Sequence, residues 1–92
     1  VEMLAACREE DSKGIAGNIT IESLAGRPLL LMDNQFAVRR SFDSACRLAG
    51  FMPIVKMESR TPHTLLALAE AGHGIAIVPS QLQIHRYKLK IQ

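Results

Sequence analysis

Two uninterrupted apolar runs constrain the fold of this chain more than any other feature of its sequence. They are residues 29–32 and residues 75–78, and Pro79 ends the second run. Each run has the length of a strand, and a strand without polar positions is typical of a parallel sheet covered on both faces. We therefore expect both runs in the core of an α/β domain.

A helix with one apolar face is predicted between these two runs, in residues 36–49. Its apolar residues follow the helical period and form one stripe, which consists of Val38, Phe42, Ala45, Cys46 and Ala49. The opposite, solvent-facing side is expected to carry Arg39, Arg40, Asp43, Ser44 and Arg47. Gly50 follows where a left-handed C-cap is expected.

A second long helix is predicted to begin at Thr61-Pro62. The Thr61 hydroxyl can cap free N–H groups, and proline suits the first helical position. The predicted buried face of this helix consists of Leu65, Leu68, Ala69 and Gly72. The glycines of Gly72-His73-Gly74 favour a tight turn before the second apolar run.

The remaining predicted elements are a strand at residues 3–7, a loop at residues 8–18, one or two helical turns between Thr20 and Gly26, a strand at residues 54–57 and an edge strand at residues 87–91. Strands therefore alternate with helices along most of the chain. That order predicts the fold class α/β, with a mainly parallel sheet, helices on both faces and right-handed connections.

Composition limits what such a domain can do. The chain has 92 residues, which is one domain and excludes a two-domain enzyme. The net charge is +2 and no basic run exceeds Arg39-Arg40, so a dedicated nucleic-acid surface is not expected. No apolar segment approaches the length of a membrane span.

Neither a catalytic centre nor a metal site is expected. Cys7 and Cys46 fit neither a disulfide framework nor a zinc site, and the three histidines lack ligand spacing. No common enzyme motif or phosphate-binding loop is present, so we expect no enzyme activity and no cofactor. The cysteine usage, together with the lack of a secretory signal pattern, favours a reducing, cytoplasmic setting.

Candidate binding residues lie in loops that follow predicted strands, because open α/β sheets bind ligands beyond the carboxyl ends of their strands. The first loop offers two amides and an aromatic ring, in the series Asp33, Asn34, Gln35 and Phe36. The second offers hydroxyls and a guanidinium, in the series Ser59, Arg60 and Thr61. Turn formation and helix capping explain both loops equally well, and capping is favoured for Thr61. A third loop, at Pro79-Ser80, is more simply explained as the end of a strand.

Three segments of the chain together resemble the effector-binding domain of LysR-type transcriptional regulators. They are Ile21-Glu22-Ser23-Leu24-Ala25-Gly26-Arg27-Pro28, then Phe42-Asp43 with Ala45-Cys46 and Gly50-Phe51, then Ala71-Gly72-His73-Gly74-Ile75-Ala76-Ile77-Val78-Pro79. The resemblance runs from about residue 19 to residue 80. It implies one Rossmann-like lobe of a periplasmic-binding-protein-like type 2 domain, in which two lobes hold a small effector in the cleft between them.

The resemblance also implies what surrounds this chain. Residues 1–92 are expected to be the second lobe alone, so the first lobe and the DNA-binding domain lie outside this sequence. The implied partners are a small-molecule effector, DNA through the other domain, and further copies in a dimer or tetramer. The resemblance places effector contacts at Asp33, Asn34, Gln35 and Phe36, and less firmly at Ser59 and Thr61, although Asp33 would repel an anionic effector.

Two other functions remain open. The same fold could serve as a lobe of a solute-binding protein or of an enzyme, which a signal peptide or catalytic residues elsewhere in the protein would indicate. Alternatively, the long helices could dimerise without any ligand. A ligand that binds only the native state raises its stability, so a thermal shift separates sensing from assembly alone.

Overall fold

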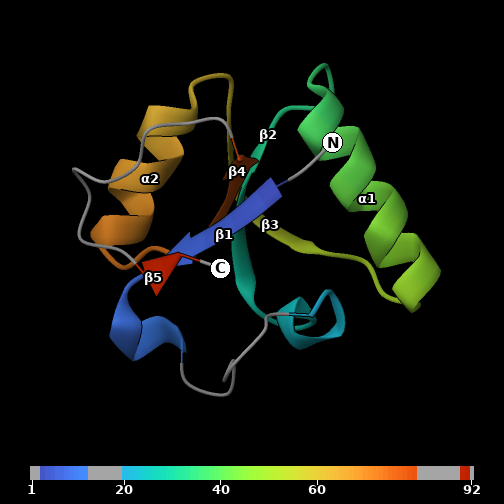
Figure 1. Ribbon diagram of the computed structural model, residues 1–92, viewed down its shortest axis with the longest axis horizontal. Coiled ribbons are helices and arrows are strands. Elements are labelled where there is room, and N and C mark those ends of the chain that lie inside the picture. The colour runs from blue at the N-terminus through green and yellow to red at the C-terminus, as the bar shows by residue number, and fades with distance from the viewer. Residues whose placement is uncertain (1–2, 13–19, 81–89, 92) are drawn as a thin grey trace.

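The computed structural model describes residues 3–12, 20–80 and 90–91 (Figure 1). Its sheet has the strand order β3-β2-β4-β1-β5. The strands are β1 (Met3–Cys7), β2 (Pro28–Met32), β3 (Ile54–Ser59), β4 (Ile75–Pro79) and β5 (Lys90–Ile91). The helices are α1 (Ala37–Ala49) and α2 (Pro62–Glu70), with short 3₁₀ turns η1 (Glu9–Ser12) and η2 (Glu22–Leu24).

Strands β3, β2 and β4 form a parallel group, as predicted, and β1 makes the complete sheet mixed. Strand β2 pairs in parallel with β3 on one side and with β4 on the other. Strand β1 pairs antiparallel with both β4 and β5, so it runs against the direction of the other strands. The carboxyl ends of β2, β3 and β4 therefore lie along one edge of the sheet.

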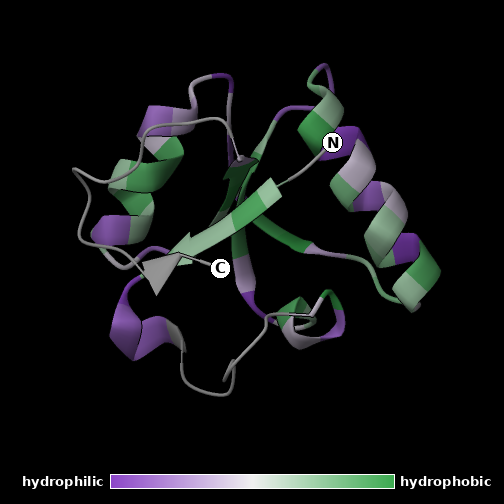
Figure 2. Ribbon diagram, viewed as in Figure 1, coloured by the Kyte–Doolittle hydropathy of each residue, from purple (hydrophilic) through white to green (hydrophobic). Residues whose placement is uncertain are grey.

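The two faces of the sheet are covered by different helices (Figure 1). Because side chains alternate along a strand, Leu29 and Leu31 pack with Phe42 of α1, whereas Leu30 packs with Leu66 of α2. Figure 2 shows hydrophobic strands between helices that carry both hydrophobic and hydrophilic residues. The predicted α/β class with helices on both faces is confirmed.

Both apolar runs are core strands, as expected. All residues from 29 to 32 and from 75 to 78 are buried. In α1, the stripe places Val38, Phe42 and Cys46 in the core, and Gly50 adopts the predicted left-handed C-cap with φ 89°. Complete burial of a side chain as large as Phe42 stabilises the fold by about 1.5–3 kcal/mol.

Several predicted boundaries differ from the structure. Strand β3 continues to Ser59 because Glu58 and Ser59 pair with the last residues of β2. The prediction ended the strand where the apolar pattern ends, because the side chains of Glu58 and Ser59 are polar. Backbone pairing does not depend on side-chain polarity, so the strand continues through both residues. Helix α1 begins at Ala37, one residue later than predicted, and η1 adds a short turn to the predicted first loop.

The buried face of α2 also differs from the prediction. It consists of Leu65, Leu66 and Ala69, whereas Leu68 is only partly buried. The buried face is therefore rotated around the helix toward Leu66 relative to the predicted stripe. Gly72 is not part of the helix, which ends at Glu70. Of the predicted edge strand at residues 87–91, only Lys90–Ile91 lies within the described residues, as β5.

Gly74 is expected to be essential to the packing of β4 against β2. A Cβ atom added at Gly74 would lie 2.6 Å from the carbonyl oxygen of Pro28, a backbone atom that cannot move without shifting β2. We predict that Gly74→Ala lowers the free energy of unfolding by about 2 kcal/mol or more, measured by urea denaturation.

Gly50→Ala provides the control, because its φ is 89° and nothing lies within 4 Å of the added atom. Backbone strain alone should cost about 1 kcal/mol there. Equal losses at the two glycines would show that the close approach to Pro28 imposes no extra cost.

Candidate ligand-binding site

Two of the three candidate loops are joined at the carboxyl edge of the sheet. We call residues 33–36, which follow β2, the first rim loop, and residues 59–61, at the end of β3, the second rim loop. The Asp33 N–H donates to the carbonyl oxygen of Ser59 at 3.2 Å. Strands β2 and β3 are parallel neighbours, so this bond closes the gap between the loops that extend from them.

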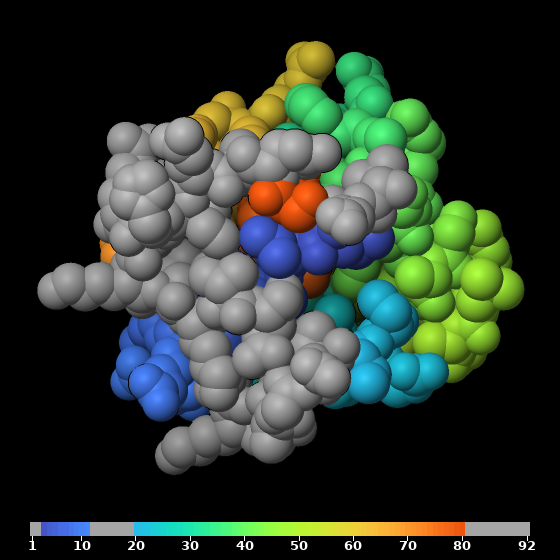
Figure 3. All heavy atoms as spheres, viewed as in Figure 1, coloured from blue at the N-terminus to red at the C-terminus, as the bar shows by residue number. Residues whose placement is uncertain are grey.

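Arg60 links the side chains of the same two loops. Its Nε lies 3.4 Å from Asp33 Oδ2, and its Nη2 lies 3.5 Å from Gln35 Oε1. The Arg60 side chain is 73% exposed, so this pair contributes little to stability. The positive charge of Arg60 nevertheless offsets the negative charge of Asp33. From the sequence alone, Asp33 was expected to repel an anionic effector. Figure 3 shows the two loops side by side, green for the first and gold for the second.

The backbone of the first rim loop is held by its own side chains and by α1. Asp33 Oδ1 accepts a hydrogen bond from the Gln35 N–H at 3.0 Å, which forms an Asx turn. Arg40 Nη1 donates to the carbonyl oxygens of Asn34 at 3.2 Å and Gln35 at 2.8 Å. The residues Asn34 and Gln35 are exposed, whereas Phe36 is partly buried and packs against the α2-side core.

The second rim loop has a hydroxyl turn of its own. Ser59 Oγ accepts a hydrogen bond from the Thr61 N–H at 3.0 Å and lies 3.2 Å from the Thr61 carbonyl oxygen, to which it donates. Thr61 is the N-cap residue of α2, but its side chain makes no capping hydrogen bond. The predicted hydroxyl cap is therefore wrong. An exposed Thr61 side chain is left on the rim.

The third candidate loop follows β4 at the same edge. Pro79 and Ser80 are both partly buried, and Pro79 ends the strand as the sequence indicated. Residues 81–89 lie outside the described residues. The structure therefore brings together the first and second loops and shows only the first two residues of the third loop, Pro79 and Ser80.

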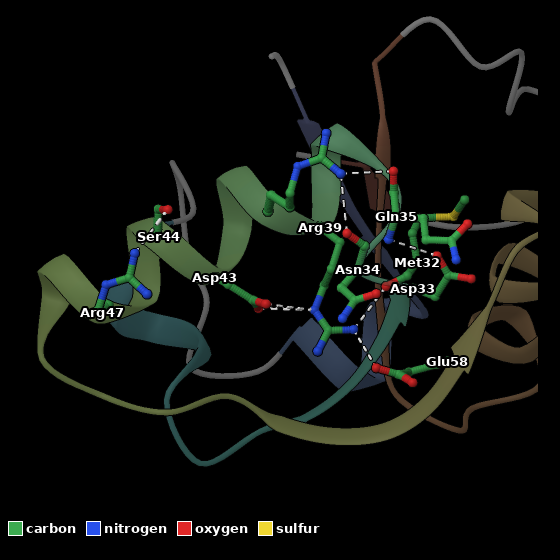
Figure 4. A network of polar contacts seen from close by, with 10 residues as sticks. Met32, Asp33, Asn34, Gln35, Arg39, Asp43, Ser44, Arg47 and Glu58 are labelled. Atoms are coloured by element: carbon green, nitrogen blue, oxygen red, sulfur yellow. Dashed lines mark hydrogen bonds and ion pairs between the residues drawn. The ribbon is translucent and has the colours of Figure 1, made fainter.

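Arg39 is the residue near the site that sequence reasoning missed (Figure 4). The sequence placed Arg39 and Asp43 on the solvent-facing side of α1, but the Arg39 side chain is only 11% exposed. Its Nε donates to both carboxylate oxygens of Asp43 at 3.0 Å, and its Nη1 donates to the Met32 carbonyl oxygen at 2.9 Å and to Glu58 Oε2 at 2.5 Å.

The electrostatics of this cluster favour a charged guanidinium. Burial alone would lower the pKa of Arg39, but hydrogen bonds to Glu58 and Asp43 outweigh that effect and the pKa is raised. The signal available in the sequence was weak. Arg39 and Asp43 have the i, i+4 spacing of a helical ion pair, which is usually found on an exposed face. The third partner, Glu58, is distant in sequence.

A separate open groove of about 620 Å³ lies between the outer side of α1 and β3. Its lining consists of Arg39, Asp43, Arg47, Gly50, Phe51, Met52, Pro53 and Val55. None of the six candidate binding residues lines it. Two residues of its lining, Met52 and Val55, are exposed apolar side chains, which suggests a contact surface rather than a polar ligand site.

The described residues contain no group of three or more His, Cys, Asp or Glu side chains that could hold a metal ion. Cys7 and Cys46 are buried and form no disulfide, and burial raises the pKa of the Cys46 thiol, which disfavours the reactive thiolate. In the part of the chain that the structure describes, no helix is long and apolar enough to span a membrane.

Comparison with known proteins identifies the family. The family model described as "LysR substrate binding domain" matches residues 1–91. The chain belongs to the LysR substrate-binding domain family. The family resemblance stated from three sequence segments is thereby confirmed. No curated protein matches the chain.

Solved structures of LysR-family proteins share this fold. The effector-binding domain of QuiR, in complex with shikimate, superposes with a TM-score of 0.86 at 17% sequence identity. The C-terminal domain of a probable LysR family transcriptional regulator from Rhodococcus sp. RHA1 gives 0.77 at 22% identity. HinK, a LysR family transcriptional regulator from Pseudomonas aeruginosa, gives 0.73 at 18% identity.

The LysR-family chain described here spans less than half the length of these structures. The match to the QuiR domain includes 98% of the residues of this chain but only 43% of the residues of the QuiR chain. The corresponding values are 99% and 46% for the Rhodococcus domain and 98% and 31% for HinK. The shared fold is therefore that of one part of each of these solved chains.

Arg39 and Arg60 are expected to differ sharply in their effect on stability. We predict that Arg39→Met lowers the free energy of unfolding by about 2 kcal/mol, because the Met32 carbonyl and two carboxylates lose a buried partner. Arg60→Met should change it by no more than about 0.5 kcal/mol, since this arginine is exposed. Urea denaturation at neutral pH measures both, and similar losses would contradict this assignment.

Proposed function

We propose that this chain is the second lobe of the effector-binding domain of a LysR-type transcriptional regulator and binds a small metabolite in the cleft between two lobes. The observation that carries the proposal is the continuous polar rim at the carboxyl edge of the sheet. There, the Asp33–Ser59 backbone bond and the Asp33–Arg60 ion pair join two loops. Family membership supports the same function.

The rim chemistry suits a small polar ligand. Exposed Asn34 and Gln35 offer amide donors and acceptors, Thr61 offers a hydroxyl, and Arg60 offers a guanidinium. Because Arg60 offsets the charge of Asp33, the rim carries no strong excess of either sign. We therefore propose a hydroxylated metabolite with at most one carboxylate. The QuiR domain in complex with shikimate gives one precedent for such chemistry in this fold.

Phe36 completes the proposed contact set at the base of the first rim loop. Its ring is partly buried and packs against the core, so its position is fixed. The ring can therefore form an apolar wall of the binding site without changing its rotamer. Ser59 contributes mainly by holding the turn that presents Thr61.

The proposed mechanism couples the ligand to a conformational equilibrium. A metabolite that contacts both lobes favours the closed cleft over the open one, and only this difference in affinity can shift the equilibrium. The shift would change how effector domains pair in a dimer or tetramer in the cytoplasm. Contact with DNA would belong to a domain outside this chain, and the lobe itself would perform no catalysis.

Self-association is a second candidate function, and one observation favours it. Leu48 and Met52, at the carboxyl end of α1 and just beyond it, are 89% and 88% exposed. Ile54, Val55 and Met57 of the edge strand β3 are also exposed, and Val55 lines the same groove as Met52. Such a surface is typical of protein contacts, and it does not overlap the rim, so both functions can coexist in one protein.

A thermal-shift screen separates these functions. We predict that the complete regulator containing this chain shows a raised Tm with shikimate or another hydroxylated acid of a metabolite panel, because a ligand at 100 times its Kd adds about 2.7 kcal/mol of stability. Sedimentation in the same samples measures the oligomer. A stable dimer whose Tm no panel compound shifts would favour the assembly function over sensing.

Substitutions in the first rim loop test the site itself. We predict that Gln35→Ala and Phe36→Ala each weaken binding of the compound giving the largest shift by about tenfold, which corresponds to a loss of about 1.4 kcal/mol. Isothermal titration measures the affinity. Glu22→Ala is the control, because Glu22 is exposed in η2, which precedes β2 and so lies toward the opposite edge of the sheet. Unchanged affinity in both rim variants would contradict the site assignment.

A further inference from the structure

Arg39 contacts the residue that immediately precedes each rim loop. Its Nη1 donates to the carbonyl oxygen of Met32, after which the first rim loop begins at Asp33. The same nitrogen donates to Glu58, after which the second rim loop begins at Ser59. One guanidinium therefore bridges the ends of two neighbouring strands at the point where both loops leave the sheet (Figure 4).

Arg39 also constrains the carboxyl end of the first rim loop, because it belongs to the helix that follows this loop. Helix α1 begins at Ala37, directly after that loop, and Arg39 lies in its first turn. The bond from Arg39 to Met32 consequently ties the residue before the loop to the helix after it. Asp43 holds Arg39 Nε from the next turn of the same helix, which orients the guanidinium toward the strands.

Other arginines near the rim do not make this set of contacts. Arg40 bonds only to carbonyls of the first rim loop, among the interactions that the structure describes. Arg60 spans both loops but through an exposed side chain. Arg47, farther along α1, donates to Ser44 Oγ at 3.3 Å. Charge-assisted bonds of a nearly buried guanidinium are stronger than those of an exposed one, so Arg39 is the stronger constraint.

We propose that Arg39 is a positioning residue for the binding rim: without touching the ligand, it sets where the two rim loops stand relative to each other. Its importance for effector affinity rests on the proposed function, whereas its action on the loops does not. A lysine cannot replace it, because a single ammonium on a flexible stem does not reach Asp43, Glu58 and the Met32 carbonyl with one fixed planar geometry.

The hydrogen bond from the Asp33 N–H to the Ser59 carbonyl is a direct reporter of this positioning, because it joins the two loops. The experiment measures amide hydrogen exchange by NMR in the complete protein without effector. Exchange at Asp33 is compared with exchange at amides of the β2–β4 ladder, which report opening of the fold as a whole.

The two test variants are Arg39→Lys, which keeps the charge, and Glu58→Ala, which removes only the link to β3. The matched control is Arg47→Lys on the same helix. We expect exchange at Asp33 to become at least about tenfold faster in both test variants relative to the ladder amides, and to stay unchanged in the control. If the two loops separate locally, exchange becomes faster at the Asp33 amide alone. If the overall stability falls, exchange becomes faster at Asp33 and at the ladder amides together.

Two results would overturn the proposal. One is unchanged exchange at Asp33 in Arg39→Lys. The other is acceleration of Asp33 and the ladder amides by the same factor, which would reduce Arg39 to a general contributor to stability. Because no effector is present, a failure to find any ligand would count against the proposed function and would leave this result standing.

Discussion

The burial of β2 and β4 on both faces is the constraint on which the rest of this structure depends. Residues 29–32 and 75–78 place side chains alternately against α1 and α2, so both helices must lie where they do to cover them. Because β2, β3 and β4 run in parallel, their carboxyl ends meet at one edge. The polar rim exists there because the apolar strands end there.

The rim and the core are connected by a polar cluster rather than by further apolar packing. Arg39 brings a charged group to the ends of β2 and β3, where the backbone carbonyl of Met32 and the carboxylate of Glu58 accept from it. The cost of burying such a group is met by charged partners and hydrogen bonds, and the raised pKa of Arg39 reflects this balance. The exposed Arg60 adds charge compensation without rigidity.

Much of the candidate site could be located from the sequence, although its internal contacts could not. The rule that ligands bind beyond parallel strands pointed to both rim loops, and the structure brings those loops together. The hydroxyl cap was the incorrect part of the Thr61 prediction, because the Thr61 side chain makes no capping hydrogen bond and the Thr61 N–H donates to the Ser59 hydroxyl. The end of β3 was also missed, since Glu58 and Ser59 join the sheet through their backbones alone.

By itself, the sequence determined the α/β class and the two core strands, because apolar periodicity and glycine or proline positions act locally along the chain. The family followed separately, from the resemblance of three sequence segments. The tertiary structure alone decided that β1 runs antiparallel, that Asp33 is paired with Arg60, and that Arg39 is nearly buried. Each of these features depends on residues far apart in the sequence. Arg39 and Glu58 meet only because α1 returns the chain to β3 beside β2, a contact that no local pattern encodes.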